Sequence, residues 1–176
     1  MENSPEKVVR VAIVGPECTG KSTLSMQLAE HYKTTYVPEY AREYIESLKR
    51  PYTIDDIVTI SKGQMQKEDE LAALANRVLI CDTNLIVTKI WAEFKYNICP
   101  TWIKENIIKR KYAIHLLTAT DIPWEKDPQR EHPDKRKELF ELYEQELVVL
   151  NLNYTIIKGT PAQRLKTAIT AINELL

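Results

Sequence analysis

The residues with the clearest chemical potential form one short segment between an apolar run and an amphipathic stretch. Residues 15–22 match the pattern G-x-x-x-x-G-K-[ST] in full, with Gly15 and Gly20 at the two glycine positions. Glycines allow backbone angles that a side chain would forbid, so consecutive N–H groups can turn inward and form a nest for anions. The segment therefore predicts a loop that binds the phosphates of a nucleotide.

Several positions of this loop have a defined chemical task. Lys21 can reach the outer phosphates as a point charge, and the hydroxyl of Ser22 can ligate Mg²⁺. A helix that begins near Lys21 adds the positive end of its dipole. The thiol of Cys18 is not required for this chemistry, and we interpret it as a tolerated small residue. The residues expected to bind ATP and Mg²⁺ here are Gly15, Pro16, Glu17, Cys18, Thr19, Gly20, Lys21, Ser22 and Thr23.

An acidic residue provides a second signature, because Asp82 directly follows the apolar run 77–81. An acid at the end of a buried strand beside a phosphate-binding loop can hold Mg²⁺ or act as a base. Since Asp82-Thr83-Asn84 precedes a helical pattern, Asp82 could instead cap that helix. We favour the metal role, with Ser22 and Asp82 as the pair that organises Mg²⁺.

Charged residues after the second apolar run could serve an acceptor molecule. The carboxyl ends of parallel strands face the ligand crevice, which would place Glu39 there, directly beyond run 34–37. Its carboxylate can orient an acceptor hydroxyl or take its proton. Arg42 lies one turn further on and would share the rim of the same pocket.

The segment from about residue 119 to residue 136 is a candidate lid. Its first fifteen residues carry three prolines and mixed charge, and a loop of this length in a compact domain is usually functional or disordered. Arg130 could fold over the phosphates and stabilise negative charge during phosphoryl transfer, and Arg136 is a weaker candidate. Trp124 supports this interpretation, because a large aromatic side chain in a polar loop usually covers something.

Five short apolar runs alternate with helical patterns along the 176 residues. Such β-branched, nearly continuous runs are typical of strands buried on both faces of a parallel sheet. The pattern predicts one α/β domain over residues 1–176, a three-layer sandwich with a mostly parallel five-stranded sheet. The expected strands are 8–14, 34–37, 77–81, 112–117 and 153–158.

Capping residues mark the expected helix ends. Thr53, with Asp56 three residues later, predicts a capping box. A charged helix is expected from about Asp134 to Leu150. Thr160 and Pro161 predict the N-cap and the first-turn proline of the last helix.

Composition excludes several classes of protein. The chain is 44% hydrophobic and 28% charged, with a formal net charge of −1 and no long basic run, so a nucleic-acid partner is not expected. Its first ten residues are polar and its apolar runs are short, so neither a signal peptide nor a membrane partner is expected. Three widely spaced cysteines favour a reducing compartment, and we expect the cytoplasm.

A phosphate-binding loop serves several classes of protein. A guanine-nucleotide switch would carry an Asn/Thr-Lys-x-Asp motif after a late strand, and residues 118–121 offer none. A large mechanical ATPase would need a further helical domain, for which this chain is too short. A small-molecule kinase needs an acceptor pocket, a lid and additional cations, and the sequence has candidates for all three.

Four segments together resemble the ribosylnicotinamide kinase domain of NadR-type proteins. They occur in the expected order between Val11 and about Arg136, and they are GPECTGKSTL, PEYAREYI, LICDTNLIVTKIW and DIPWEKDPQREHPDKR. The resemblance implies a P-loop NTP hydrolase fold with a nucleoside-monophosphate-kinase-like architecture. It also implies a reaction in which ATP phosphorylates the ribose 5′-hydroxyl of nicotinamide riboside to give nicotinamide mononucleotide.

The resemblance assigns roles to the residues already singled out. The catalytic set would be Lys21, Glu39, Asp82 and Arg130, with the choice of base between Glu39 and Asp82 left open. Aromatic faces attract a cationic pyridinium ring, so aromatic residues join the candidates for acceptor binding. Those candidates are Glu39, Tyr40, Arg42, Trp91 and Trp124, with Tyr36 as a further stacking residue. As in related kinases, adenine would lie near Gly159, Thr160 and Pro161.

Two departures from the family limit these assignments. Family members often have Asp-Thr-Asp after the third strand, whereas this chain has Asp82-Thr83-Asn84, which leaves the role of Asn84 open. Full-length regulators of this type also carry an adenylyltransferase domain and sometimes a DNA-binding domain, which we do not expect in these residues. A separate adenylyltransferase would then use the mononucleotide.

Two alternatives remain from the sequence. The acceptor could be another nucleoside or a small metabolite. The chain could also be a nucleotide-dependent regulatory module whose lid signals to a partner.

Overall fold

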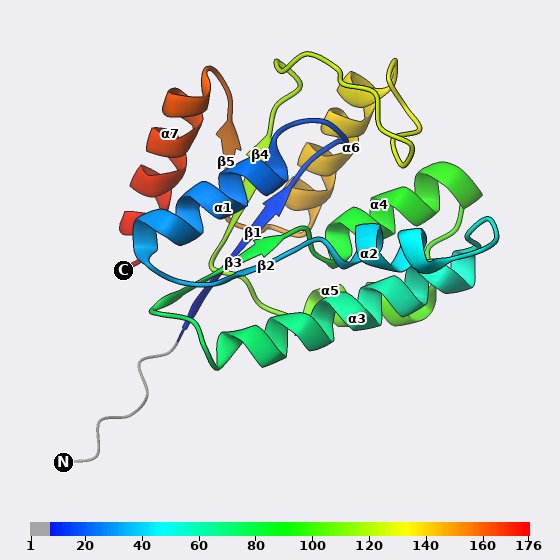
Figure 1. The fold of residues 1–176 in the computed structure, drawn as a ribbon, viewed down its shortest axis with the longest axis horizontal. Coiled ribbons are helices and arrows are strands. Elements are labelled where there is room, and N and C mark those ends of the chain that lie inside the picture. The colour runs from blue at the N-terminus through cyan, green and yellow to red at the C-terminus, as the bar shows by residue number, and fades with distance from the viewer. Residues whose placement is uncertain (1–7) are drawn as a thin grey trace.

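A parallel sheet of five strands forms the centre of the computed structural model, which describes residues 8–176 (Figure 1). The spatial order of the strands is β2-β3-β1-β4-β5, and each neighbouring pair is parallel, which confirms the expected α/β fold. The expected strands all form, with shifted ends. The strands are β1 (Val9–Val14), β2 (Tyr36–Val37), β3 (Val78–Asp82), β4 (Ile114–Thr118) and β5 (Tyr154–Ile157). The polar segment 1–7 lies outside the described residues.

Helices cover both faces of this sheet, and at least one helix separates each strand from the next in sequence. None of the helices formed by residues 8–176 combines the length and the apolarity needed to span a membrane. The helices are α1 (Lys21–Tyr32), α2 (Tyr40–Ser47), α3 (Ile54–Ala72), α4 (Leu85–Tyr96), α5 (Thr101–Lys109), α6 (Arg136–Val149) and α7 (Pro161–Asn173).

Alternation along β1 sorts the core into two layers. Val11 and Ile13 face the layer formed by α1 and α7, whereas Ala12 and Val14 face α4 and α6. All four side chains are fully buried. This burial on both faces explains why β1 has an apolar sequence without a polar alternation, as parallel strands usually do.

Both capping motifs expected from the sequence form, and one helix start differs from the expectation. Thr53 and Asp56 form the expected capping box of α3, and Thr160 caps α7 with Pro161 in its first turn. The charged helix α6 begins two residues later than expected, at Arg136. The residues before it form a turn in which the N–H of Lys135 donates to the carbonyl of His132 (3.2 Å).

The strand order places a switch point at the centre of the sheet. β1 pairs with β3 on one side and with β4 on the other, so the chain turns in opposite directions on either side of β1. In open α/β sheets, ligands bind beyond the carboxyl ends of the strands at such a point. Residues 15–20 follow β1 there, and they lead directly into α1.

Candidate active site

The glycines of the 15–22 loop are required by its geometry. Gly15 has a φ of 141°, and a Cβ on it would lie 2.5 Å from the Oγ1 of Thr118 on β4. Gly20 has a φ of 80° and is the N-cap of α1. Positive φ values of this kind favour glycine, and the first contact leaves no space for a side chain. The loop therefore curls as its sequence pattern predicts.

Lys21 lies folded against this loop. Its Nζ donates to the carbonyl of Gly15 (3.0 Å) and to the carbonyl of Pro16 (2.8 Å). The ammonium group is thus held at the mouth of α1, where the N-terminal end of the helix dipole adds positive potential. Loop, helix end and ammonium together form a site for an anion such as a phosphate group.

Ser22 and Asp82 meet below the loop. The Ser22 hydroxyl donates to Asp82 Oδ2 over 2.5 Å. Asp82 is 1% exposed, and among the described residues its Oδ1 has no hydrogen-bond partner. Burial, together with the nearby charge of Glu39, raises the pKa of Asp82 to about 6.

These two side chains fit Mg²⁺. Hydroxyl and carboxylate oxygens are the ligands that Mg²⁺ prefers, and the unpaired Oδ1 is a buried acceptor that lacks a donor. The described residues contain no group of three or more His, Cys, Asp or Glu side chains arranged to hold a metal. Phosphate oxygens and water would complete the shell, as is usual for Mg²⁺ in nucleotide sites.

Asn84 has a structural role at the start of α4. Its Oδ1 accepts a hydrogen bond from the N–H of Ile86 (3.0 Å), which makes Asn84 the N-cap. The alternative assignment of Asp82 as the cap of this helix is therefore wrong. An asparagine satisfies the orphan N–H without a charge, which explains how this chain tolerates an amide at that position.

A cleft of about 420 Å³ opens beside the phosphate loop. Residues 15–23 line one end, and four other sequence candidates line the remainder: Glu39, Arg42, Trp91 and Arg130. The cleft therefore brings the expected donor residues and several expected acceptor residues into one space. Asp82 lies beneath it and reaches it through Ser22.

An aromatic wall lines the cleft, and of its members only Trp91 is predicted from the sequence. Tyr52 and Phe94 line it beside Trp91. The Nε1 of Trp91 donates to the hydroxyl of Tyr52 (3.1 Å), and the two rings meet edge to face at 4.9 Å. Burial raises the pKa of Tyr52 to about 12, and its hydrogen bond to Glu131 adds to this effect. Phe94 could have been found, because it follows Trp91 by three residues on the same helix.

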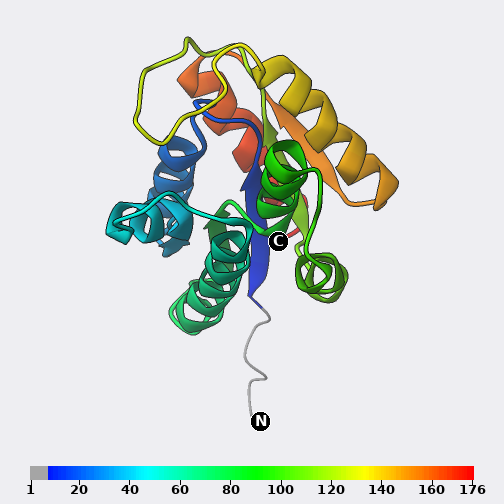
Figure 2. The same cartoon turned by 90° about the vertical axis from the view of Figure 1, so that its right-hand side faces the viewer.

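The segment formed by residues 119–135 lies over the phosphate loop and over α2. Its position above α2 is visible in Figure 2. Arg42 forms an ion pair with Asp127 in this segment (3.1 Å). Arg136 donates to the carbonyls of Cys18 (2.9 Å) and Ile122 (2.8 Å). Arg130 lines the cleft, and its Nη1 donates to the carbonyl of Glu125 (2.6 Å). The segment thus contacts α2 through Asp127 and lines the cleft through Arg130, and its role as a lid stays a prediction.

Four other predicted contacts fall outside this cleft. The ring of Tyr40 packs on Gly63 of α3, where a Cβ would lie 2.1 Å from it. The ring of Trp124 lies under the guanidinium group of Arg136 (5.7 Å). Tyr36 packs against the core layer next to α1. Residues 159–161 do not line the cleft either, although they lie close to the phosphate loop.

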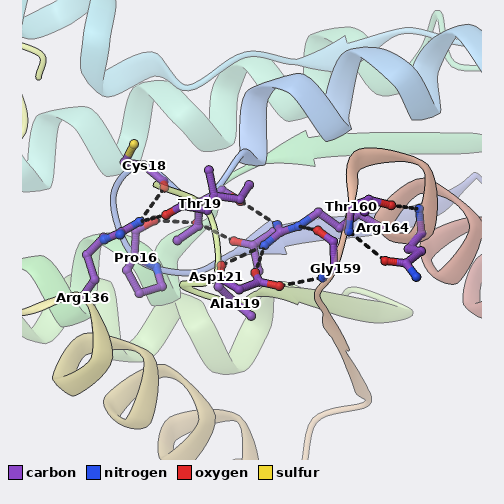
Figure 3. A network of polar contacts seen from close by, with 12 residues as sticks. Pro16, Cys18, Thr19, Ala119, Asp121, Arg136, Gly159, Thr160 and Arg164 are labelled. Carbon is purple, nitrogen blue, oxygen red and sulfur yellow. Dashed lines mark hydrogen bonds and ion pairs between the residues drawn. The ribbon is translucent and has the colours of Figure 1, made fainter. Parts of the chain in front are cut away.

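Arg164 joins residues 159–161 to the phosphate loop (Figure 3). Its guanidinium group donates to the carbonyls of Thr19 (2.9 Å) and Ala119 (3.0 Å), and it forms an ion pair with Asp121. Its Nε donates to the carbonyl of Gly159 (3.1 Å). Three loops are therefore held by one buried side chain. The role of Arg164 is not predicted from the sequence, although Arg164 follows the predicted cap Thr160 by one helical turn.

Comparisons with known proteins agree with this fold. A family model described as AAA_28, AAA domain, matches residues 10–164. The trifunctional NAD biosynthesis/regulator proteins NadR of Salmonella typhimurium and Escherichia coli are each 29% identical to this chain, over 130 and 132 residues. Each alignment covers 72% of this chain and 32% of the relative, so it spans about a third of the length of those proteins.

Solved structures show the same architecture. NadR in complex with NR matches with a TM-score of 0.83 at 23% identity, over 96% of this chain and 51% of that one. Deoxyadenosine kinase from M. mycoides matches with a TM-score of 0.68 at 14% identity, over 94% and 100% of the two chains. Thymidylate kinase from Ehrlichia chaffeensis matches with a TM-score of 0.67 at 13% identity, over 96% and 99%.

The full phosphate-loop motif, its place after the central strand and the match over residues 10–164 lead to one conclusion. This chain belongs to the AAA_28 family of P-loop domains, and it resembles the NadR proteins within the P-loop kinase fold.

Proposed function

We propose that this protein is an ATP-dependent ribosylnicotinamide kinase, which phosphorylates the 5′-hydroxyl of nicotinamide riboside. The observation that carries the proposal is the continuous cleft that joins the phosphate loop to the aromatic wall at Tyr52, Trp91 and Phe94. One end suits a triphosphate and the other suits a flat cation, because aromatic faces attract cationic rings. The NadR structure solved with NR supports this choice of acceptor.

In the mechanism that we propose, the phosphate loop positions the donor. Backbone N–H groups and Lys21 bind the outer phosphates and offset the charge that develops on them during in-line transfer. Ser22 and Asp82 would hold Mg²⁺, which would supply positive charge to offset the negative charge of the phosphates. Arg130 lies on the lid side of the same cleft, where its guanidinium group can approach the transferring phosphate.

Glu39 and Asp82 differ in what they can do for the acceptor. Glu39 lines the cleft at the N-terminus of α2, so its carboxylate can accept the proton of a hydroxyl bound there. Asp82 is buried, and one of its oxygens is already bonded to Ser22. We therefore propose Glu39 as the group that orients or deprotonates the acceptor, and Asp82 as the metal ligand.

A coupled ADP-release assay tests the proposal. Nicotinamide riboside, adenosine, cytidine and thymidine are offered side by side with ATP and Mg²⁺. We expect release with nicotinamide riboside well above that with the other three. Release with another nucleoside, and none with nicotinamide riboside, would transfer the assignment to that nucleoside.

The same assay distinguishes a kinase from a nucleotide-dependent regulatory module. Glu39→Gln keeps the size of the side chain and removes its ability to take a proton. General-base groups typically contribute about 10²- to 10⁴-fold, so a loss in that range is expected for a kinase. An unchanged rate would refute the role of Glu39, whereas nucleotide binding without ADP release for any acceptor would favour the regulatory module.

The product suggests one partner. Nicotinamide mononucleotide is a substrate for an adenylyltransferase, and we propose that a separate enzyme of that class consumes it. Kinase and adenylyltransferase mixed in one vessel should then convert nicotinamide riboside and ATP to NAD.

A further inference from the structure

Glu17 is an unexpected residue for a phosphate loop. It lies between Pro16 and Cys18, and it lines the cleft in which the loop would bind a triphosphate. A carboxylate repels phosphate groups, and like charges at such a short range weaken binding. An acid at this position therefore calls for a compensating task.

The structure supplies that task on the lid. The carboxylate of Glu17 accepts hydrogen bonds from the backbone N–H of Glu131, at 3.2 Å and 3.0 Å to its two oxygens. It also accepts one from the N–H of His132 (3.1 Å). Hydrogen bonds to an ionised acceptor are stronger than neutral ones, so this contact holds two consecutive lid residues on the phosphate loop.

The same lid residue is held on the acceptor side by its side chain. Tyr52 donates its hydroxyl to Glu131 Oε2 (2.6 Å), and Lys95 forms an ion pair with Glu131 Oε1 (2.9 Å). Tyr52 belongs to the aromatic wall of the cleft. Glu131 therefore connects the two ends of the cleft, through its backbone to Glu17 and through its carboxylate to Tyr52.

We propose that Glu17 is a positioning residue, whose carboxylate latches the lid to the phosphate loop and couples donor binding to acceptor binding. The latch consists of Glu17 and the N–H groups of Glu131 and His132. This inference rests on the proposed function for the identity of the acceptor. A nucleotide that orders residues 15–22 orders Glu17 with them, and so fixes Glu131 over the acceptor site.

Amide hydrogen exchange tests the latch without any acceptor. In Glu17→Ala, exchange at the amides of Glu131 and His132 should be faster by about tenfold or more, because a bond to a charged acceptor is lost. The amide of Gln129 is an internal control, since it donates to Asp127 in the same lid (2.9 Å). Its exchange should stay unchanged. If the amides of Glu131 and His132 exchange at the same rate in Glu17→Ala as in the parent protein, the latch is refuted.

Ligand binding tests the coupling. In the parent protein, the ATP analogue AMP-PNP should tighten nicotinamide riboside binding by about fivefold or more, which is the usual lower range of coupling between sites. In Glu17→Ala and Glu17→Gln, AMP-PNP should change the affinity for nicotinamide riboside by no more than about twofold. Coupling that survives in both variants would refute the proposal.

Nucleotide affinity separates positioning from general damage. Removal of a negative charge from the phosphate site should leave AMP-PNP affinity equal or higher in Glu17→Gln, whereas a misfolded loop would bind it more weakly. Glu30→Gln, an exposed carboxylate on α1, is the matched control and should behave as the parent. If nicotinamide riboside fails to bind at all, the exchange result alone decides the latch, and only the proposed function fails.

Discussion

At the scale of single residues, the donor side of the site is determined locally. Gly15, Lys21 and Ser22 lie in one continuous segment, so the type and spacing of these residues already predict their neighbours. The close approach of Gly15 to Thr118 explains why one of those positions admits no side chain.

Lys21→Ala should abolish most of the phosphoryl transfer. The ammonium group donates to the loop carbonyls of Gly15 and Pro16, beside which the outer phosphates would bind. Removal of one preorganised electrostatic contact typically costs about 10²- to 10³-fold in rate. Steady-state kinetics with saturating ATP measure this loss, and Lys33→Ala at the other end of α1 is a suitable control. ATP turnover at the parent's rate would contradict the site.

Asp82 should impose a pH dependence that Mg²⁺ alters. Burial raises the pKa of Asp82 to about 6, so the carboxylate is protonated below that pH and cannot bind a metal well. We expect kcat/KM to increase as the pH rises through about 6. Because the metal competes with the proton, more Mg²⁺ should move the increase to lower pH. The pH profile is measured from pH 5 to pH 8 at different Mg²⁺ concentrations. If the profile does not shift with the Mg²⁺ concentration, this role of Asp82 is refuted.

At the scale of elements, a glycine on α3 allows the close packing of α2. α2 has no buried residue of its own, yet it carries Arg42 and follows Glu39, which both line the cleft. Its Tyr40 ring rests on Gly63 in the middle of α3. The contact between these two helices therefore fixes the acceptor side of the site.

Gly63→Ala should destabilise the protein, against the usual preference of helices. In a free helix interior, alanine is better than glycine by about 1 kcal/mol. Here the new Cβ would lie 2.1 Å from the Tyr40 ring, and overpacking typically costs about 1–3 kcal/mol. Urea unfolding measures the change, and Gly63→Ala combined with Tyr40→Ala should recover the helix preference. A more stable Gly63→Ala protein would contradict this packing.

At the scale of the whole molecule, buried ionisable groups set the response of stability to pH. His115 on β4 is 2% exposed, and burial lowers its pKa to about 4. Its Nδ1–H donates to the carbonyl of Asn153 (3.4 Å), and its Nε2 has no partner among the described residues. The folded protein therefore keeps this imidazole neutral at a pH where the unfolded chain would protonate it.

This difference predicts a loss of stability in mild acid. The unfolded His115 has an ordinary pKa near 6.5, so between pH 6.5 and pH 4 the unfolded chain binds more protons and stability falls as the pH falls. From pH 7 to pH 5, the parent should lose about 2 kcal/mol more than His115→Phe. Urea unfolding at both pH values measures this. Parallel losses in the two proteins would show that His115 does not titrate as the burial implies.

The sequence predicts some parts of this molecule far better than others. The five strands, two helix caps and the phosphate loop follow from patterns within about twenty residues. Arg164, Tyr52 and the task of Glu17 depend on segments that meet only after folding, so spacing along the chain carries no signal for them. Aromatic residues suit the acceptor site, so the sequence predicts Tyr40 and Trp124 there, but sequence alone does not predict which way each ring turns.

The two ends of the cleft come from different parts of the chain, and this separation bears on how such proteins diversify. The donor end is built by residues 15–23, with Asp82 below it and Arg164 behind it. The opposite wall comes from residues 39–52 and from α4. Mutations in this opposite wall can therefore accumulate and change which acceptor binds, while the donor end still binds ATP. A chimera that receives residues 39–52 from a relative should inherit that relative's acceptor preference without a change of donor.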